Sequence, residues 1–364
     1  MANSSLNETQ LLKGPDGWNN LFLYGCYFFL GLAIGLGNVV IVAAILKYKA
    51  LRRSKVHLIM MALAVSDAFN MFAHVCGGAY RTIKVLKGTH SDLMRAWDCM
   101  WTTHSLIWSF VHSQSTLMLA VVSFDRLMCV IKPLNYLARP HSFAWGMIGA
   151  VYGYTYMVGA LGIGLTYHTR NGPPTISAAC IPPQAFNYSN KTYAKYFAMA
   201  PTVFAMTSIC IYAVVWKVHK RKKAQLVQSV GQTAGQKRLK QQRRLTQSLG
   251  ISCLCTFFFY IVPWMAGNVT TWLGYSSINF IFWVMAMINP ACNIFIYPLR
   301  LPEMKKAIKG LFLNKVLPYN LDLWERPQKK HVQPALSSAN IDRKNRYQTP
   351  KGQQEKDYGH IDRF

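Results

Sequence analysis

The chain has 364 residues, of which 52% are hydrophobic and only 15% are charged. Soluble domains carry about 25% charged residues, so this deficit argues against a soluble protein and indicates that much of the chain lies in lipid. The 40 Lys and Arg residues outnumber the 13 Asp and Glu residues and fall between long apolar runs, which is typical of membrane topology and not of a nucleic-acid-binding surface.

Seven apolar runs along the chain are long enough to cross a bilayer, which takes about 20 residues of helix. They cover residues 20–46, 56–80, 100–129, 143–166, 194–218, 246–268 and 276–299. We therefore predict an all-α membrane protein, a seven-transmembrane helix bundle over residues 20–299. An N-terminal segment, 1–19, precedes the bundle, and a short helix, 300–313, and a disordered tail, 314–364, follow it.

The distribution of positive charge predicts the orientation, because Lys and Arg favour the cytoplasmic side of a membrane. With the N-terminus outside, the cytoplasmic loops and tail hold 32 of the 40 basic residues. Glycosylation sequons at Asn3, Asn7, Asn187 and Asn190 then all lie outside, where this modification occurs. We expect a multi-pass protein of the plasma membrane with an extracellular N-terminus.

Two cysteines mark the outer side of the predicted bundle. Cys99 opens the third span and Cys180 lies in the second outer loop, on the face where a disulfide is stable. We predict a Cys99–Cys180 disulfide, with Cys76 near the outer end of the second span as the competing partner.

Asp67 is the one acid in the middle of any predicted span. A buried carboxylate must be neutralised by a proton, a cation or polar partners. Asn38, Ser115, Asn289 and Asn293 are the polar residues at similar depth in the other spans. They predict a polar network around Asp67.

Short motifs follow one another through the spans in a fixed order. They are Gly37-Asn38, Leu63 to Asp67, Ser123 to Leu127, Pro133 to Tyr136, Pro201, Pro263 and Asn293 to Tyr297. In this order, and on these sides of the membrane, they resemble the landmarks of the rhodopsin-like G-protein-coupled receptors over residues 20–313. The resemblance implies a receptor that binds an extracellular ligand, activates a heterotrimeric G protein and has no catalytic activity of its own.

The resemblance also implies roles for single residues. Asp125 would hold Arg126 in the resting state, and Arg126 would contact the G protein in the active state. Asn293 and Tyr297 would belong to the activation motif of span seven, and Pro263 would kink span six. The alternative for span seven starts the motif at Asn289 and puts Asn293 in the place of the tyrosine.

The same resemblance implies a sodium ion beside Asp67, held with Ser115, Asn289 and Asn293. The alternative is a protonated Asp67 in a structural hydrogen-bond network. We expect no other metal and no other cofactor.

The chain departs from the common family pattern at several positions. Ile261 stands where span six usually carries a Trp, and Ile294 stands where a Pro usually follows the Asn of span seven. Together with the intact Asp125-Arg126 pair, these departures look like those of the nematode serpentine chemoreceptors of the sx class.

Aromatic and imidazole side chains in the outer halves of spans three, six and seven are candidates for a ligand pocket: His104, Trp108, His112, Tyr260, Trp264 and Trp283. In amine receptors the position of Trp108 is an Asp, so a monoamine ligand is disfavoured. The set predicts a neutral or apolar small chemosensory molecule, and a neuropeptide receptor that binds the end of a peptide is the alternative. Arg81 and Lys84 at the rim would attract an anion.

After the last span, the apolar residues of segment 301–312 recur at helical spacing, with basic residues on the other face. This pattern predicts an amphipathic helix eight on the inner membrane lipid. Ser337, Ser338 and Thr349 in the tail are candidate sites for a receptor kinase or arrestin.

A seven-span ligand-gated channel or a transporter is the rival class. A channel of this kind would have its N-terminus inside the cell, and a transporter would usually show internal repeats.

Overall fold

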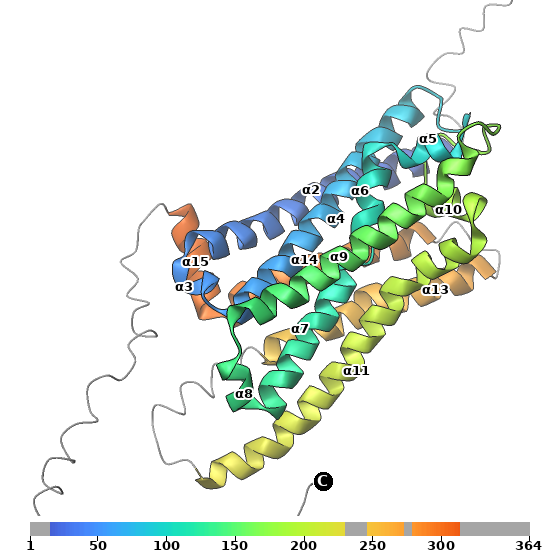
Figure 1. Cartoon of the computed structure of the whole chain (residues 1–364). Helices are drawn as coiled ribbons and strands as arrows, with labels where there is room; N and C mark the ends of the chain where they lie inside the picture. Colours follow the sequence, from blue (N-terminus) through green and yellow to red (C-terminus); the bar gives the residue numbers. More distant parts are fainter. Residues whose placement is uncertain (1–14, 230–245, 273–278, 314–364) are drawn as a thin grey trace, which may run out of the picture. The chain divides into compact units, whose positions relative to one another are not determined.

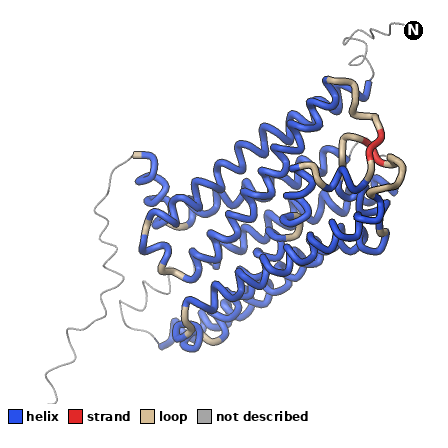
Figure 2. The backbone as a smooth tube through the Cα atoms, turned by 45° about the horizontal axis from the view of Figure 1, so that its top comes forward, coloured by secondary structure: helices blue, strands red, loops and turns tan. Residues whose placement is uncertain are grey.

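The computed structural model describes residues 15–229, 246–272 and 279–313 (Figure 1). The sequons at Asn3 and Asn7 and the tail sites Ser337, Ser338 and Thr349 lie outside these residues. The described part of the chain is a bundle of long helices that run side by side, with the connecting loops gathered at its two ends (Figure 2).

The membrane-length helices are α2 (Pro15–Lys47), α4 (Lys55–Leu86), α6 with α7 (Thr103–Val111 and Gln114–Ile131), α9 (His141–Thr166), α11 (Lys191–Ser229), residues 246–256 continued by η2 (Phe257–Ile261) and α13 (Val262–Trp272), and α14 (Asn279–Arg300). The short elements are α3 (Lys49–Arg52), β1 (Leu93–Met94), α5 (Ala96–Met100), α8 (Pro133–Ala138), η1 (Tyr167–Thr169), β2 (Ile176–Ser177), α10 (Pro182–Ser189) and α15 (Pro302–Phe312).

The helices of the bundle are apolar, and so is much of the surface that they present to the surroundings. In the described part of the chain, six helices are long and apolar enough to cross a membrane, and a seventh span is completed if the bent pair Val284–Arg300 and Pro302–Phe312 is counted as one. Large apolar side chains such as Phe29, Leu161 and Phe295 are more than half exposed. In a soluble protein such a surface is rare, but in lipid it is the favoured one.

Small residues let helices approach closely where the sequence has glycine. A Cβ atom at Gly78 of α4 would lie 2.7 Å from the carbonyl oxygen of Tyr24 and 2.8 Å from the nitrogen of Phe28, both on α2. These distances are too short for any side chain, so Gly78 permits backbone contact between α2 and α4.

The third span is not the single helix over 100–129 that the sequence predicts. It begins at Thr103 and is interrupted after Val111, and the second helix starts at Gln114. The run His112 to Thr116 is polar throughout, and the Thr116 hydroxyl donates to the Ser113 carbonyl at 3.0 Å. Polar side chains that bond nearby backbone compete with the helix ladder, which accounts for the break.

Span six contains a π-helical turn, η2, which ends two residues before Pro263. Proline has no N–H to donate to the preceding turn, so a wider turn just before it is a physically reasonable adjustment. The structure thus has a change of helix type next to Pro263, and the kink at Pro263 itself stays a prediction.

At one end of the bundle, which the sequence predicts to be the outer one, β1 and β2 pair antiparallel, with Leu93 opposite Ser177 and Met94 opposite Ile176. The short strands mark this end in Figure 2. Asn187 and Asn190, at the end of α10, are both exposed. At the other end of the bundle, α15 leaves α14 at 101°.

Candidate functional site

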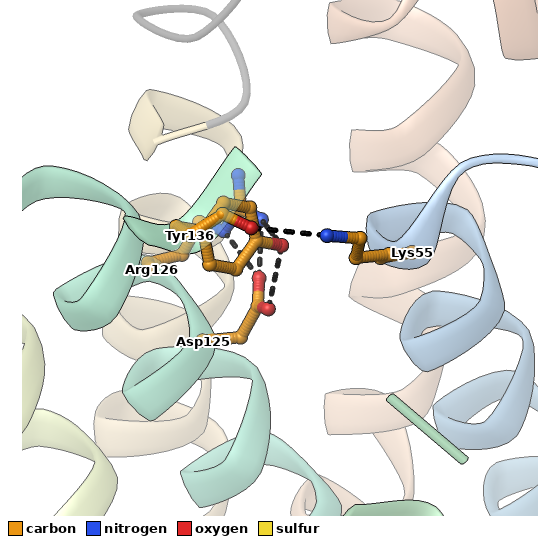
Figure 3. Close-up of polar contacts among 4 residues, drawn as sticks. All are labelled: Lys55, Asp125, Arg126 and Tyr136. Atoms are coloured by element: carbon orange, nitrogen blue, oxygen red, sulfur yellow. Dashed lines mark hydrogen bonds and ion pairs between the residues drawn. The ribbon is translucent and has the colours of Figure 1, made fainter. Parts of the chain in front are cut away.

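At one end of the bundle, three side chains form a buried cluster: Asp125, Arg126 and Tyr136 (Figure 3). It is named here the inner charge cluster, after the cytoplasmic side on which the sequence predicts it. Arg126 donates from Nε to Asp125 Oδ2 at 3.0 Å, and its Nη2 also contacts that oxygen. The Tyr136 hydroxyl donates to Asp125 Oδ1 at 2.7 Å. Both charged residues are only 2% exposed, so each depends on the other for its counter-charge.

Tyr136 comes from α8, the short helix that Pro133 starts at its first turn. Burial, with the nearby Asp125 carboxylate, raises the pKa of Tyr136 despite the opposing charge of Arg126. The phenol therefore stays protonated and remains a donor to Asp125 well above neutral pH.

Lys55 ties the cluster to the start of α4. Its Nζ donates to the Tyr136 carbonyl at 3.0 Å and also contacts the Arg139 carbonyl (Figure 3). The same nitrogen lies 5.0 Å from the centre of the Tyr136 ring. Lys55 thus positions α8 against α4, a role that the sequence did not indicate.

A second polar group, the Ser–Ser–Cys cluster, joins α7, α11 and the helix over 246–256. The hydroxyls of Ser123 and Ser208 share a hydrogen bond of 2.8 Å, and Cys253 Sγ lies 3.7 Å and 3.6 Å from them. All three residues are buried. This cluster holds span six to spans three and five.

Deeper in the bundle, Asp67 and Asn293 meet as the sequence predicts. Asn293 Nδ2 donates to Asp67 Oδ2 at 3.0 Å, and Asn293 Oδ1 accepts from Ser252 Oγ at 2.6 Å. The Ser115 hydroxyl lies near Asp67, but by distance and angle it has no hydrogen-bond partner among the described residues. Asp67 is 2% exposed, so this network sits in a desolvated place.

The other two residues predicted for this network bond elsewhere. Asn289 Oδ1 accepts from Thr256 Oγ1 at 2.9 Å. Asn38 Nδ2 donates to the Ile34 carbonyl of its own helix at 3.1 Å, and Asn38 Oδ1 has no partner among the described residues. Tyr297, predicted for the activation motif, is fully buried, and its hydroxyl also lacks a partner among the described residues.

At the end of the bundle that holds β1 and β2, the predicted disulfide between Cys99 and Cys180 is present, and Cys76 is free. His104 Nε2 lies 3.0 Å from the Cys180 carbonyl. Arg81, which the sequence placed at the rim, reaches the same loop: its Nε and Nη2 donate to the carbonyls of Ala179 and Cys180 at 3.0 and 2.9 Å.

Two of the predicted pocket residues pack against each other with tilted rings. The rings of Trp108 and His112 lie 4.0 Å apart, and His112 stacks on Phe197 of α11 at 4.9 Å. The sequence analysis did not select Phe197. Tyr260 lies in the π turn and Trp264 at the start of α13, and both are partly buried. The side chain of Trp283 lies outside the described part of the structure.

The sequence model of the serpentine type 7TM GPCR chemoreceptors, Srsx, matches residues 29–312. The chain belongs to the Srsx family. The match runs from α2 to the end of α15 and includes every described residue of the inner charge cluster and of the Asp67 network. This Srsx-family protein is therefore a seven-transmembrane receptor and not an enzyme.

Two vertebrate receptors show weaker similarity to the Srsx-family chain. A D(1)-like dopamine receptor of Oreochromis mossambicus is 28% identical over 175 residues, which are 47% of this chain and 42% of that receptor. Trace amine-associated receptor 7b of Mus musculus is 22% identical over 341 residues, which are 87% of this chain and 88% of that receptor. The chain thus spans less than half of the first relative.

Proposed function

We propose that this Srsx-family receptor binds a chemosensory ligand between the outer ends of its helices and, in response, activates a heterotrimeric G protein at its cytoplasmic end. The inner charge cluster carries this proposal. Arg126 is buried, and Asp125 and Tyr136 account for its described side-chain contacts, so a different arrangement of α8 would leave the guanidinium more available to a partner protein.

The resting state follows from the energy of the Asp125–Arg126 pair. A buried pair is costly to separate unless the freed charge finds a new partner. The docking of a G protein supplies acceptors for Arg126 only in the active state. A ligand that prefers the active arrangement then shifts an existing equilibrium towards it.

The outer residues favour a ligand other than a monoamine, although the names of both relatives refer to amines. Trp108 stands where amine receptors carry an acid, and it packs on His112. We propose a small chemosensory molecule that contacts these rings. A peptide end is the second candidate, and the aromatic surroundings suit both.

We propose an extracellular N-terminus on the charge distribution, with 32 of 40 basic residues on the inner side. On this topology α15 lies on the inner leaflet, and the tail is available to a kinase or arrestin. An antibody against an N-terminal epitope should bind intact cells, and one against a C-terminal epitope should need permeabilised cells. The reverse pattern would exclude the receptor orientation.

The coupling role of Arg126 is tested with an Arg126→Ala variant. Wild type and variant are expressed with an outer epitope tag and screened with odorants and peptides against Gα biosensors. Arg139→Ala is the matched control, because that guanidinium lies 4.2 Å from the Phe143 ring on the same side. We expect Arg126→Ala to abolish G-protein activation at equal surface display, and Arg139→Ala to retain most of it.

A ligand-evoked current that survives Arg126→Ala would support the rival channel instead. Equal G-protein activation by wild type and Arg126→Ala would contradict the proposed coupling mechanism.

A further inference from the structure

Arg81 is a cation near the outer end of α4 whose surroundings contain no described acid. Its two hydrogen bonds to described residues go to the neutral backbone carbonyls of Ala179 and Cys180. A guanidinium has five N–H donors, so three remain without a partner among the described residues. Partly buried charges are normally paired.

Among the acids of the outer segments whose side chains are described, none supplies that charge. Asp98 is paired with Arg95 at 2.8 Å, and Asp92 is exposed in the loop before β1. Lys84, one turn beyond Arg81, adds a second cation, and its Nζ lies 5.8 Å from the Tyr80 ring. This corner of the bundle therefore carries an unbalanced positive charge.

The guanidinium of Arg81 is partly buried near aromatic side chains, which shields it from part of the surrounding water. Arg81 Cζ lies 5.8 Å from the centre of the Tyr24 ring of α2. The Tyr80 ring packs on His104 of α6 at 5.0 Å. A charge interaction at such a place is stronger than in water, and a planar fork of donors matches a carboxylate or another oxyanion.

We propose that the ligand of this receptor carries an anionic oxygen group, most simply a carboxylate, which binds the free donors of Arg81 between α2, α4 and α6, below the loop held by the Cys99–Cys180 disulfide. This inference rests on the proposed receptor function and adds that the ligand is negatively charged. The charge of this ligand is opposite in sign to that of an amine, because Trp108 replaces the acid that an amine would need and Arg81 supplies the cation.

The loop contacts of Arg81 add a consequence for specificity. Because Nε and Nη2 hold the carbonyls next to Cys180, the guanidinium is fixed in orientation before the anion arrives. Lysine would keep the charge at this position but would lose the planar, forked arrangement of N–H donors.

The test measures binding directly, by the thermal unfolding of purified receptor in nanodiscs. The probes are matched sets with one skeleton: phenylacetate, phenylacetamide and phenethylamine, and octanoate, octanamide and octylamine. N-acetyl-phenylalanine and its amide represent a peptide terminus. The variants are Arg81→Gln, Arg81→Lys and the control Arg95→Gln, whose guanidinium already has its own acid.

We expect at least one acid to raise the unfolding temperature of the wild type, with little effect from its amide or amine. Arg81→Gln should weaken the apparent affinity for that acid about ten- to hundredfold, which is the range for losing a charged hydrogen-bond partner. Arg81→Lys should retain part of the affinity, and Arg95→Gln should match the wild type. Stabilisation by octanoate or phenylacetate would indicate that the ligand is a small acid. Stabilisation by N-acetyl-phenylalanine alone would indicate a peptide terminus.

The proposal is overturned if no acid stabilises the wild type, if an amide or amine does so equally well, or if Arg81→Gln responds as the wild type does. Because Arg81→Gln also removes loop contacts, the Arg81→Lys variant and the intact Cys99–Cys180 disulfide serve as checks of folding. Binding is measured without G protein. A failure of coupling at Arg126 is therefore seen separately from a failure of anion binding at Arg81.

Discussion

Asn293 donates a hydrogen bond from Nδ2 to Asp67 Oδ2 at 3.0 Å, although the two residues are 226 positions apart in the chain. The other end of the same amide accepts from Ser252 at 2.6 Å. One side chain of α14 therefore links α4 to the helix over 246–256. A change in the charge of Asp67 therefore alters a hydrogen-bond network that includes residues of two other spans.

Replacement of Asp67 by Ala should destabilise the receptor, because the buried Asn293 amide loses its acceptor. We expect a loss of about 1–3 kcal/mol in unfolding free energy, measured by thermal unfolding in detergent. Asp98→Ala is the control, since Asp98 forms a partly exposed pair with Arg95 and such pairs contribute about 0–1 kcal/mol. A smaller loss for Asp67→Ala than for Asp98→Ala would contradict the network.

The sodium prediction is separate and uses Asp67→Asn, which keeps the shape and removes the charge. Replacement of sodium chloride by choline chloride should lower the unfolding temperature of the wild type, because a bound cation stabilises only the folded state. The variant should unfold at the same temperature in both salts. Equal curves for the wild type would favour a protonated Asp67.

Tyr136→Phe should raise basal G-protein activation, because Asp125 loses the 2.7 Å hydrogen bond at Oδ1 and Arg126 is held less firmly. A hydrogen bond to a charged group contributes about 1.5–3 kcal/mol, so we expect a rise of about ten- to hundredfold. Since burial raises the pKa of Tyr136, its phenol should stay protonated and the wild-type basal signal should not depend on this group around neutral pH. Unchanged basal activity in the variant would mean that Tyr136 does not restrain Arg126.

Cys253→Ala should also raise basal activation, because the Ser–Ser–Cys cluster joins span six to spans three and five in the observed arrangement. Each contact to sulfur is weak, so we expect about a two- to fivefold rise in the biosensor signal. Cys210→Ala is the matched control, because Cys210 is exposed on α11. If both variants behave alike, the cluster has no role in holding span six.

Removal of the disulfide by Cys99→Ala or Cys180→Ala should sharply reduce surface display, as measured by antibody binding to an outer epitope. The loss of a native disulfide commonly costs about 2–5 kcal/mol. Cys76→Ala should leave display unchanged, because that thiol is free and only partly buried. Equal loss in all three variants would point to a general intolerance of these positions.

The sequence by itself determined the class of protein, because a helix that meets lipid must be apolar over its whole length and the seven runs meet this condition. It also located Asp125, Arg126, Asp67 and Asn293, since charged and amide side chains inside a span stand out against their surroundings. The disulfide followed from topology, with Cys76 left as a rival that the structure removes.

The tertiary structure decided which of these residues meet. The hydroxyls of Ser123 and Ser208, the Lys55 ammonium and the Phe197 ring are ordinary in the sequence, and their roles appear only when three helices converge. The break at Ser113 was missed for a related reason: hydropathy averages over a span and does not register local competition for backbone hydrogen bonds. Arg81 is the clearest example of what only the folded structure decides, because the position of a cation in the sequence does not show whether folding brings an acid beside it.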